Sequence, residues 1–104
     1  MSEIFLDKIL KDCFWEYDFT KEDILDMAKS QDLSKKKFLF EKILANSTSL
    51  LKSMQIFDKN TLEDLIESYK VPKFNQEYLL RRINMLEFFF LEKPLKINEL
   101  KWVA

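Results

Sequence analysis

The chain has no glycine in 104 residues, and this absence limits its folds more than any other feature. Glycine supplies the positive-φ positions of tight two-residue hairpins, so a fold built from many such hairpins is disfavoured. Glycine-rich phosphate loops and the dinucleotide-binding fingerprint also need backbone positions that only glycine tolerates. The sequence therefore argues against an all-β fold and against these nucleotide-binding motifs.

Apolar residues recur at spacings of three and four, which is the period of an amphipathic helix. A first helix is expected from near Ser2, with an apolar stripe of Leu6, Ile9, Leu10, Cys13, Phe14 and Tyr17. A capping residue with an acid three positions later predicts the start of two further helices. The first start is Thr20 to Asp23, and the helix that follows carries the apolar residues Ile24, Leu25, Met27 and Ala28. The second start is Asn60 to Glu63, and its helix carries Leu62, Leu65, Ile66 and Tyr69.

Three more segments complete the helical pattern. Ser34 is expected to cap a helix that runs to about Ala45, with Phe38, Leu39, Ile43 and Leu44 pointing inward. A polar break follows at residues 46–49. A further apolar stripe follows at Leu50, Leu51, Met54 and Phe57. Asn75 is expected to cap the longest helix, residues 76 to about 91, and Pro94 to end it. The tail from Leu95 to Ala104 fits either a short helix or an extended strap.

These segments predict an all-α fold, a compact bundle of five or six short helices around an aromatic-rich core. Ten Phe, two Trp and three Tyr residues supply much of the buried area that a small core needs. No internal repeat or low-complexity linker interrupts the pattern. Residues 1–104 are therefore expected to form a single helical domain.

Histidine is absent and Cys13 is the only cysteine, which removes most of the usual catalytic and metal-binding chemistry. Cys13 lies on the apolar stripe and is interpreted as a buried, inert thiol. The acidic pairs Glu22/Asp26 and Glu63/Glu67 each stand one helical turn apart. Solvated helix faces explain them better than catalysis or metal binding. We therefore expect a non-enzymatic protein with no cofactor and no bound metal.

Charge is unevenly distributed along the chain, although the net charge is only −1. Residues 1–34 carry nine acidic and four basic side chains, whereas residues 35–60 carry six basic and two acidic ones. Such a dipolar chain lacks the overall basic character of a dedicated nucleic-acid binder. The acidic start and the short apolar runs predict neither a signal peptide nor a membrane span. A cytoplasmic location is the resulting expectation.

The last long helix carries four candidates for binding a partner, namely Arg81, Arg82, Phe88 and Phe89. Phe88, Phe89 and the adjacent Phe90 cover about 200° of a helix surface. Either this helix is central, which is the favoured interpretation for a small domain, or it also meets another chain or a second copy. At least one of the two adjacent arginines should face solvent, within reach of Glu77.

The stretch Phe14 to Phe19, FWEYDF, offers a fifth candidate, Trp15. A continued helix would extend the Phe14/Tyr17 stripe and pair Trp15 with Phe19 on a second face. An extended chain would put Trp15, Tyr17 and Phe19 on one face, opposite Phe14. We expect most of these rings to be core, closing the first helix onto the third and the last. Trp15 is expected to be partly exposed and to touch a partner.

Lys35, Lys36 and Lys37 stand at the predicted start of the third helix, where cations oppose the helix dipole. They form either a solvated face or a phosphate contact, in which Ser34 to Ala45 would be the reading helix of a helix-turn-helix-like unit. The sequence shows no wing, arm or wider basic face, so it favours the solvated face. A small DNA-binding regulator is the alternative function.

Two segments, FWEYDF and the KFLFEKIL of residues 37–44, resemble a group of small uncharacterised prokaryotic proteins. In that group a Phe-Trp-acid-x-Asp-Phe segment precedes a helix. The core of this helix has an aromatic residue or Ile, then three variable residues, then Glu, a basic residue, Ile or Val, and Leu. Lys42 stands where the group often has Arg, and the resemblance covers about the first half of the chain. These proteins are often encoded beside an abortive-infection-type nucleotidyltransferase toxin. The resemblance thus implies an antitoxin-like partner of such a toxin, and it transfers no catalytic residues.

Overall fold

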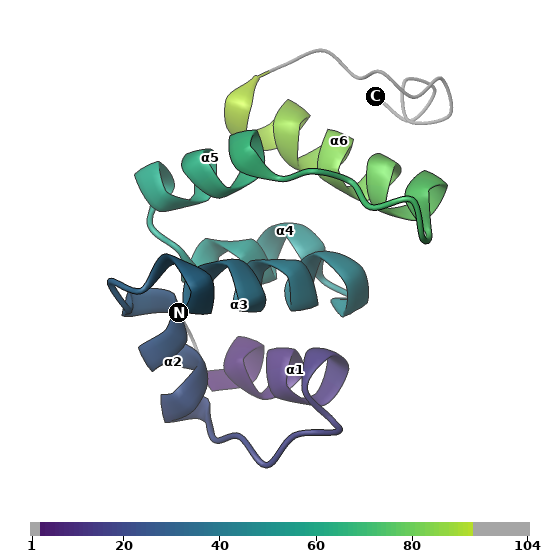
Figure 1. The fold of residues 1–104 in the computed structure, drawn as a ribbon. Helices are drawn as coiled ribbons and strands as arrows, with labels where there is room; N and C mark the ends of the chain where they lie inside the picture. The colour runs from purple at the N-terminus through teal and green to yellow at the C-terminus, as the bar shows by residue number, and fades with distance from the viewer. Residues whose placement is uncertain (1–2, 93–104) are drawn as a thin grey trace. The chain divides into compact units, whose positions relative to one another are not determined.

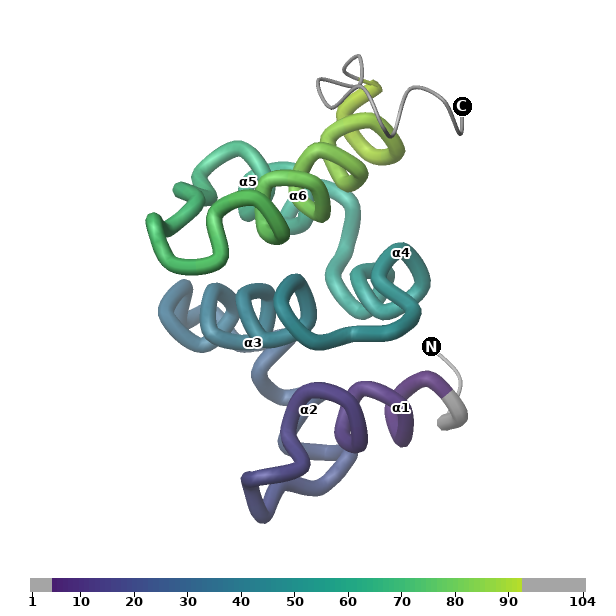
Figure 2. The backbone as a smooth tube through the Cα atoms, turned by 90° about the vertical axis from the view of Figure 1, so that its right-hand side faces the viewer, coloured from purple at the N-terminus to yellow at the C-terminus, as the bar shows by residue number. Residues whose placement is uncertain are grey.

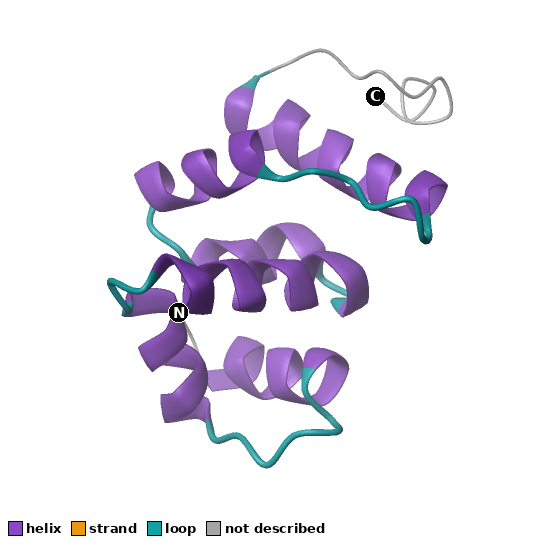
Figure 3. Ribbon diagram, in the orientation of Figure 1, coloured by secondary structure: helices purple, strands orange, loops and turns teal. Residues whose placement is uncertain are grey.

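The described part of the chain is entirely helical. The computed structural model describes residues 3–92, with side chains from residue 5 onward. These residues form six α-helices and one 3-10 helix, and none of them lies in a strand (Figures 1 and 3). The elements are α1 (Glu3–Cys13), α2 (Lys21–Lys29), α3 (Leu33–Asn46), α4 (Leu50–Ser53), η1 (Met54–Ile56), α5 (Lys59–Ser68) and α6 (Gln76–Leu91). The all-α prediction is confirmed. Pro94 and the tail from Leu95 lie outside the described residues.

The chain divides into two compact units, Met1–Leu62 and Glu63–Ala104, with the boundary inside α5. In the first unit α3 contacts α1, α2 and α4, and α1 also contacts α2 and α4. Figure 2 shows the path of the backbone through these helices. The assignment of the whole chain to a single domain stays a prediction.

The core of the first unit consists of the apolar stripes that the sequence predicted, with one addition. The side chains with almost no exposed surface include Ile9, Phe14, Ile24, Leu39, Phe40, Ile43, Leu44 and Met54. Phe40 was not expected to point inward, but its ring lies 6.4 Å from that of Phe57, centroid to centroid. Cys13 is buried, as predicted. None of the described helices is long and apolar enough to span a membrane.

The predicted capping box at Thr20 is confirmed and opens α2. The Asp23 N–H donates to Thr20 Oγ1 over 3.2 Å, and the Thr20 N–H donates back to Asp23 Oδ2 over 2.8 Å. This reciprocal pair satisfies two of the backbone donors that a helix start leaves without partners. It also fixes the position of the Asp23 carboxylate.

Two other predicted helix starts are wrong by two residues. Asp32, not Ser34, caps α3, because its carboxylate accepts the Ser34 N–H over 2.9 Å. Asp58, not Asn60, takes this role at α5, where its carboxylate accepts the Thr61 N–H over 2.8 Å. The Thr61 hydrogen bonds lower the pKa of Asp58 from its ordinary value. In both cases an aspartate two residues earlier caps the helix. A carboxylate accepts backbone N–H groups well, and its negative charge interacts favourably with the positive end of the helix dipole.

In the second unit, α6 has the predicted bounds, but its start differs from the prediction. Asn75 occupies the cap position in the left-handed region, with φ 53°, and its side chain makes no capping hydrogen bond. Asparagine tolerates this conformation better than most residues do. Glu92 ends the helix at φ 57°, and its N–H donates to the Glu87 carbonyl. Leu79, Ile83 and Leu86 form the buried side of α6.

The polar break after α3 is held by side-chain hydrogen bonds. The hydroxyl oxygens of Ser47 and Ser53 lie 2.8 Å apart and are buried. Asp12, at the end of α1, accepts both the Thr48 N–H (3.1 Å) and the Thr48 hydroxyl (2.7 Å). Burial by itself raises the pKa of Asp12, but the Thr48 hydrogen bonds and the charges of Lys8 and Lys11 outweigh it, so the pKa is lowered from 3.8. The Asp12 carboxylate thus ties α1 to a segment 36 residues away.

Asp12→Ala is expected to lower the free energy of unfolding by about 1 kcal/mol at neutral pH, since it removes two partly solvated hydrogen bonds to a charged group. A lowered folded pKa gives stability that is complete above the unfolded value, near 3.8, and is lost as pH falls through the folded value. The difference between parent and variant should therefore shrink below about pH 4. Urea unfolding of both chains at neutral and acidic pH measures it, with the exposed Asp64→Ala as control. A difference that stays constant with pH would contradict this role.

Candidate interaction surfaces

The FWEYDF stretch forms a turn, so neither the continued helix nor the extended strand is correct. α1 ends at Cys13, and the Tyr17 N–H donates to the Phe14 carbonyl over 2.9 Å. The turn brings Phe14 against both Tyr17 and Phe19, with ring centroids 5.6 and 5.5 Å apart. Neither alternative predicted this, because each placed Phe19 on a different face from Phe14. A helical or strand period does not apply where the backbone reverses.

Four rings meet at this turn, and we call Phe14, Tyr17, Phe19 and Phe38 the aromatic cluster. Phe38 comes from α3 and lies 5.9 Å from Phe14, so the cluster joins the end of α1 to α3. The rings therefore close the first helix onto the third, as expected, and the contact with the last helix stays a prediction. The expectation that most rings of the FWEYDF stretch are core is wrong: only Phe14 is buried, Phe19 is half-buried and Tyr17 is 39% exposed. Trp15 is 73% exposed, which confirms that it faces solvent. Its role in partner binding is not decided by exposure.

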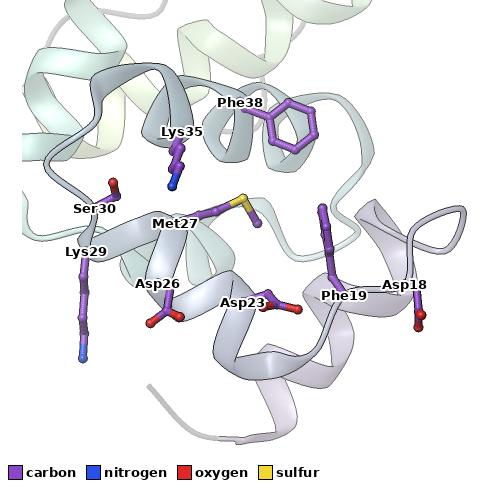
Figure 4. Close-up of a pocket in the computed structure, with 9 residues that line it drawn as sticks. All are labelled: Asp18, Phe19, Asp23, Asp26, Met27, Lys29, Ser30, Lys35 and Phe38. Carbon is purple, nitrogen blue, oxygen red and sulfur yellow. The ribbon is translucent and has the colours of Figure 1, made fainter.

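An open pocket lies beside the aromatic cluster in the first unit, and the sequence did not predict it. Its volume is about 820 Å³. Figure 4 shows Phe19, Met27 and Phe38 around a common space, with the Asp23 carboxylate turned toward Phe19. The other residues that line it are Asp18, Asp26, Lys29, Ser30 and Lys35. The sequence signal was present, in rings and carboxylates interleaved around α2, but only the turn before α2 brings Phe19 opposite Phe38.

On α6, a group of six residues that we call the α6 strip lies away from the buried side. Its members are Tyr78, Arg81, Arg82, Met85, Phe88 and Phe89, which span about 120° of the helix at 100° per residue. Tyr78 is 46% exposed, Phe88 38% and Phe89 57%. The interpretation of the Phe triplet as the centre of the core is therefore wrong for Phe88 and Phe89. Leu79, Ile83 and Leu86 already supply the buried side, so the triplet extends the apolar surface beyond it.

Contacts within the α6 strip hold its side chains in place. The Arg82 guanidinium lies 5.3 Å from the centre of the Tyr78 ring, and the rings of Phe88 and Phe89 meet edge to face at 5.5 Å. Arg81 reaches Glu77 at 3.8 Å, which confirms the predicted ion pair. That pair is largely exposed and contributes little stability. The strip thus presents aromatic and arginine side chains that contact one another at the surface.

The three lysines at the start of α3 do not form one face. Lys35 lines the pocket, and Lys37 is exposed. The charge of Lys36 contributes to the lowered pKa of Asp58. Consecutive helical residues point about 100° apart, which explains this divergence.

The acidic pairs show exposed carboxylates at Glu22, Asp26 and Glu67, whereas Glu63 is half-buried. Among the described residues, no group of three or more cysteine, aspartate or glutamate side chains is placed to hold a metal ion.

Comparison with known protein families, curated proteins and solved structures finds no match for this chain. Function must therefore be inferred from the surfaces themselves.

Phe14→Ala and Trp15→Ala are expected to have very different effects, although the two rings are neighbours. Phe14 is 2% exposed, so its removal leaves a cavity in the cluster and should lower the free energy of unfolding by about 3 to 5 kcal/mol. Trp15→Ala should change it by less than about 0.5 kcal/mol, as for other exposed sites. Urea unfolding followed by circular dichroism measures both. A large loss for Trp15→Ala would mean that this ring is core.

Proposed function

We propose that the chain is a non-enzymatic protein–protein interaction module whose main contact is the α6 strip. The observation that carries this proposal is the exposure of Tyr78, Phe88 and Phe89 beside Arg81 and Arg82. Aromatic residues, Met and Arg are enriched at the centres of protein interfaces, and Tyr and Arg are frequent among the residues that dominate binding energy. Covering such rings removes apolar area from water, at about 25 cal/mol per Å².

The partner that we propose is a nucleotidyltransferase toxin of the abortive-infection type, with the chain as its antitoxin-like inhibitor. The identity of this partner is inferred from the resemblance of the FWEYDF and KFLFEKIL segments and from the acidic bias of residues 1–34. Residues 1–34 carry nine acidic and four basic side chains. An enzyme that handles nucleotides needs a basic active site, and an acidic surface complements such a site and accelerates association with it.

The test is capture of the partner by the tagged chain from its own host, with variants that change the α6 strip. Arg82→Ala and Phe89→Ser should each weaken capture at least about tenfold, as expected for residues at the centre of an interface. Leu80→Ser is the matched control, because Leu80 is also exposed on α6 but lies outside the strip. Trp15→Ala, measured in parallel, reports whether the turn takes part. Circular dichroism establishes that every variant is folded.

Three outcomes separate the parts of the proposal. A captured nucleotidyltransferase whose transfer activity falls on binding supports the full proposal. Capture of a different protein through the α6 strip supports the interaction module and overturns the antitoxin part. If nothing is retained, or if Leu80→Ser weakens capture as much as Phe89→Ser, the strip is not the contact.

DNA binding is the second candidate, and one observation favours it. Only three residues, 30–32, separate α2 from α3, and the two helices are in contact, as in a helix-turn-helix unit. The divergence of Lys35, Lys36 and Lys37 weakens this candidate, since phosphate contacts need a shared face.

Replacing all three lysines by glutamate should abolish any DNA binding, and the affinity of the parent should fall steeply with salt. A mobility-shift assay with the DNA upstream of the gene, at low and moderate salt, measures both effects. The absence of a shift at low salt would end this candidate.

A further inference from the structure

Phe19, Met27 and Phe38 form the apolar part of the wall of the pocket beside the aromatic cluster. Phe19 stacks on Tyr17 with ring centroids 5.1 Å apart, and Phe38 packs against the buried Phe14. These contacts hold the two rings on either side of the space that Met27 also lines (Figure 4). A pocket whose walls are already in place costs its ligand little ordering energy on binding.

Charge in the pocket is arranged from one end to the other. Asp18 and Asp23 lie at the end near Phe19, and of these two Asp23 is turned toward the ring while Asp18 points away from the space (Figure 4). At the end toward Ser30, Asp26 lies beside Lys29, and Lys35 points toward Met27. The Thr20 N–H holds one oxygen of Asp23, and the carboxylate is turned toward the Phe19 ring. The end near Phe19 therefore combines a fixed carboxylate with an aromatic face, and both attract a cation.

The aromatic cluster already attracts one cation from within the chain. Lys42 Nζ lies 5.2 Å from the centre of the Tyr17 ring and 5.8 Å from that of Phe38. Two of the four rings, Tyr17 and Phe38, thus lie within cation–π distance of a positive charge. The carboxylates near Phe19 would strengthen this attraction on the pocket side.

We propose that this pocket receives an arginine side chain of the partner protein, together with an adjacent apolar side chain of the same segment. This inference rests on the proposed function and adds a second contact to it. Arginine fits better than lysine, because its planar guanidinium stacks on a ring while its N–H groups meet a carboxylate. The volume of about 820 Å³ exceeds what one side chain needs, which explains why a neighbouring residue enters with it. Met27, a flexible and polarizable side chain, suits the apolar contact.

The experiment uses the full chain, labelled with ¹⁵N and at the methionine methyl groups, and a blocked hexapeptide, Leu-Arg-Ala-Leu-Arg-Ala. Saturable shifts are expected at the Phe19 and Asp23 amides and at the Met27 methyl, with Kd on the order of 1 mM. The same peptide with citrulline for both arginines keeps the shape and loses the charge. It should bind at least about fivefold more weakly.

Two variants test the carboxylates. Asp23→Asn keeps an acceptor for the Thr20 N–H and should weaken the arginine peptide about fivefold. Asp18→Asn with Asp26→Asn removes two other carboxylates that line the pocket, and it should therefore also weaken binding. This double variant leaves the capping box unchanged, so it remains informative if Asp23→Asn disturbs α2. The matched control is Asp64→Asn with Glu67→Gln, two exposed carboxylates on α5 that do not line the pocket. Its affinity for the peptide should equal that of the parent.

The proposal is overturned if the arginine and citrulline peptides shift the pocket residues equally, or if neither gives saturable shifts. It is also overturned if the α5 control weakens binding as much as the pocket variants. These results would leave the proposed function standing, because capture through the α6 strip is measured with different variants. Conversely, the capture experiment could fail while the arginine peptide still saturates the pocket. That result would contradict the role of the α6 strip and support the arginine site.

Discussion

The first unit depends on the burial of one ring, Phe14, at the point where α1 ends. Phe14 contacts Tyr17 and Phe19 from the turn that follows it and Phe38 from α3. A single side chain thus connects the end of α1, the turn that follows it and α3. No residue from Phe14 to Phe19 has a positive φ, so this turn does not require glycine, and the large area that the rings bury stabilises it.

The same arrangement has a consequence for binding. A turn that places Phe14 inward leaves Trp15 in water and sets Phe19 opposite Phe38. The capping box of α2 then holds Asp23 beside Phe19. The proposed arginine site therefore shares residues with the core of the first unit, whereas on α6 the two are separate. There Leu79, Ile83 and Leu86 are buried, and Tyr78, Phe88 and Phe89 of the α6 strip are exposed.

The functional conclusion follows from what the surfaces present. The described residues offer aromatic and arginine side chains in mutual contact on α6, and in the first unit a pocket in which Asp23 lies beside apolar side chains. Both are suited to holding another protein, and the acidic bias of residues 1–34 favours a basic one. An interaction module accounts for both surfaces with a single partner, whereas DNA binding leaves the exposed rings of α6 without a role.

The sequence alone determined the all-α class, the bounds of α6, the Thr20 capping box and the burial of Ile9, Ile24 and Ile43, because these depend on local periodicity and on hydrogen bonds between close neighbours. Only the tertiary structure decided the rest. The reversal after Cys13 joins Phe14 to Phe38 across the chain, and no period encodes such a contact. Which side of α6 is buried was likewise not local, since Phe88 and Phe89 are as apolar as Leu86. Where the apolar arc is wider than one buried side, as on α6, its sequence pattern does not choose which part of the arc is covered, and packing decides.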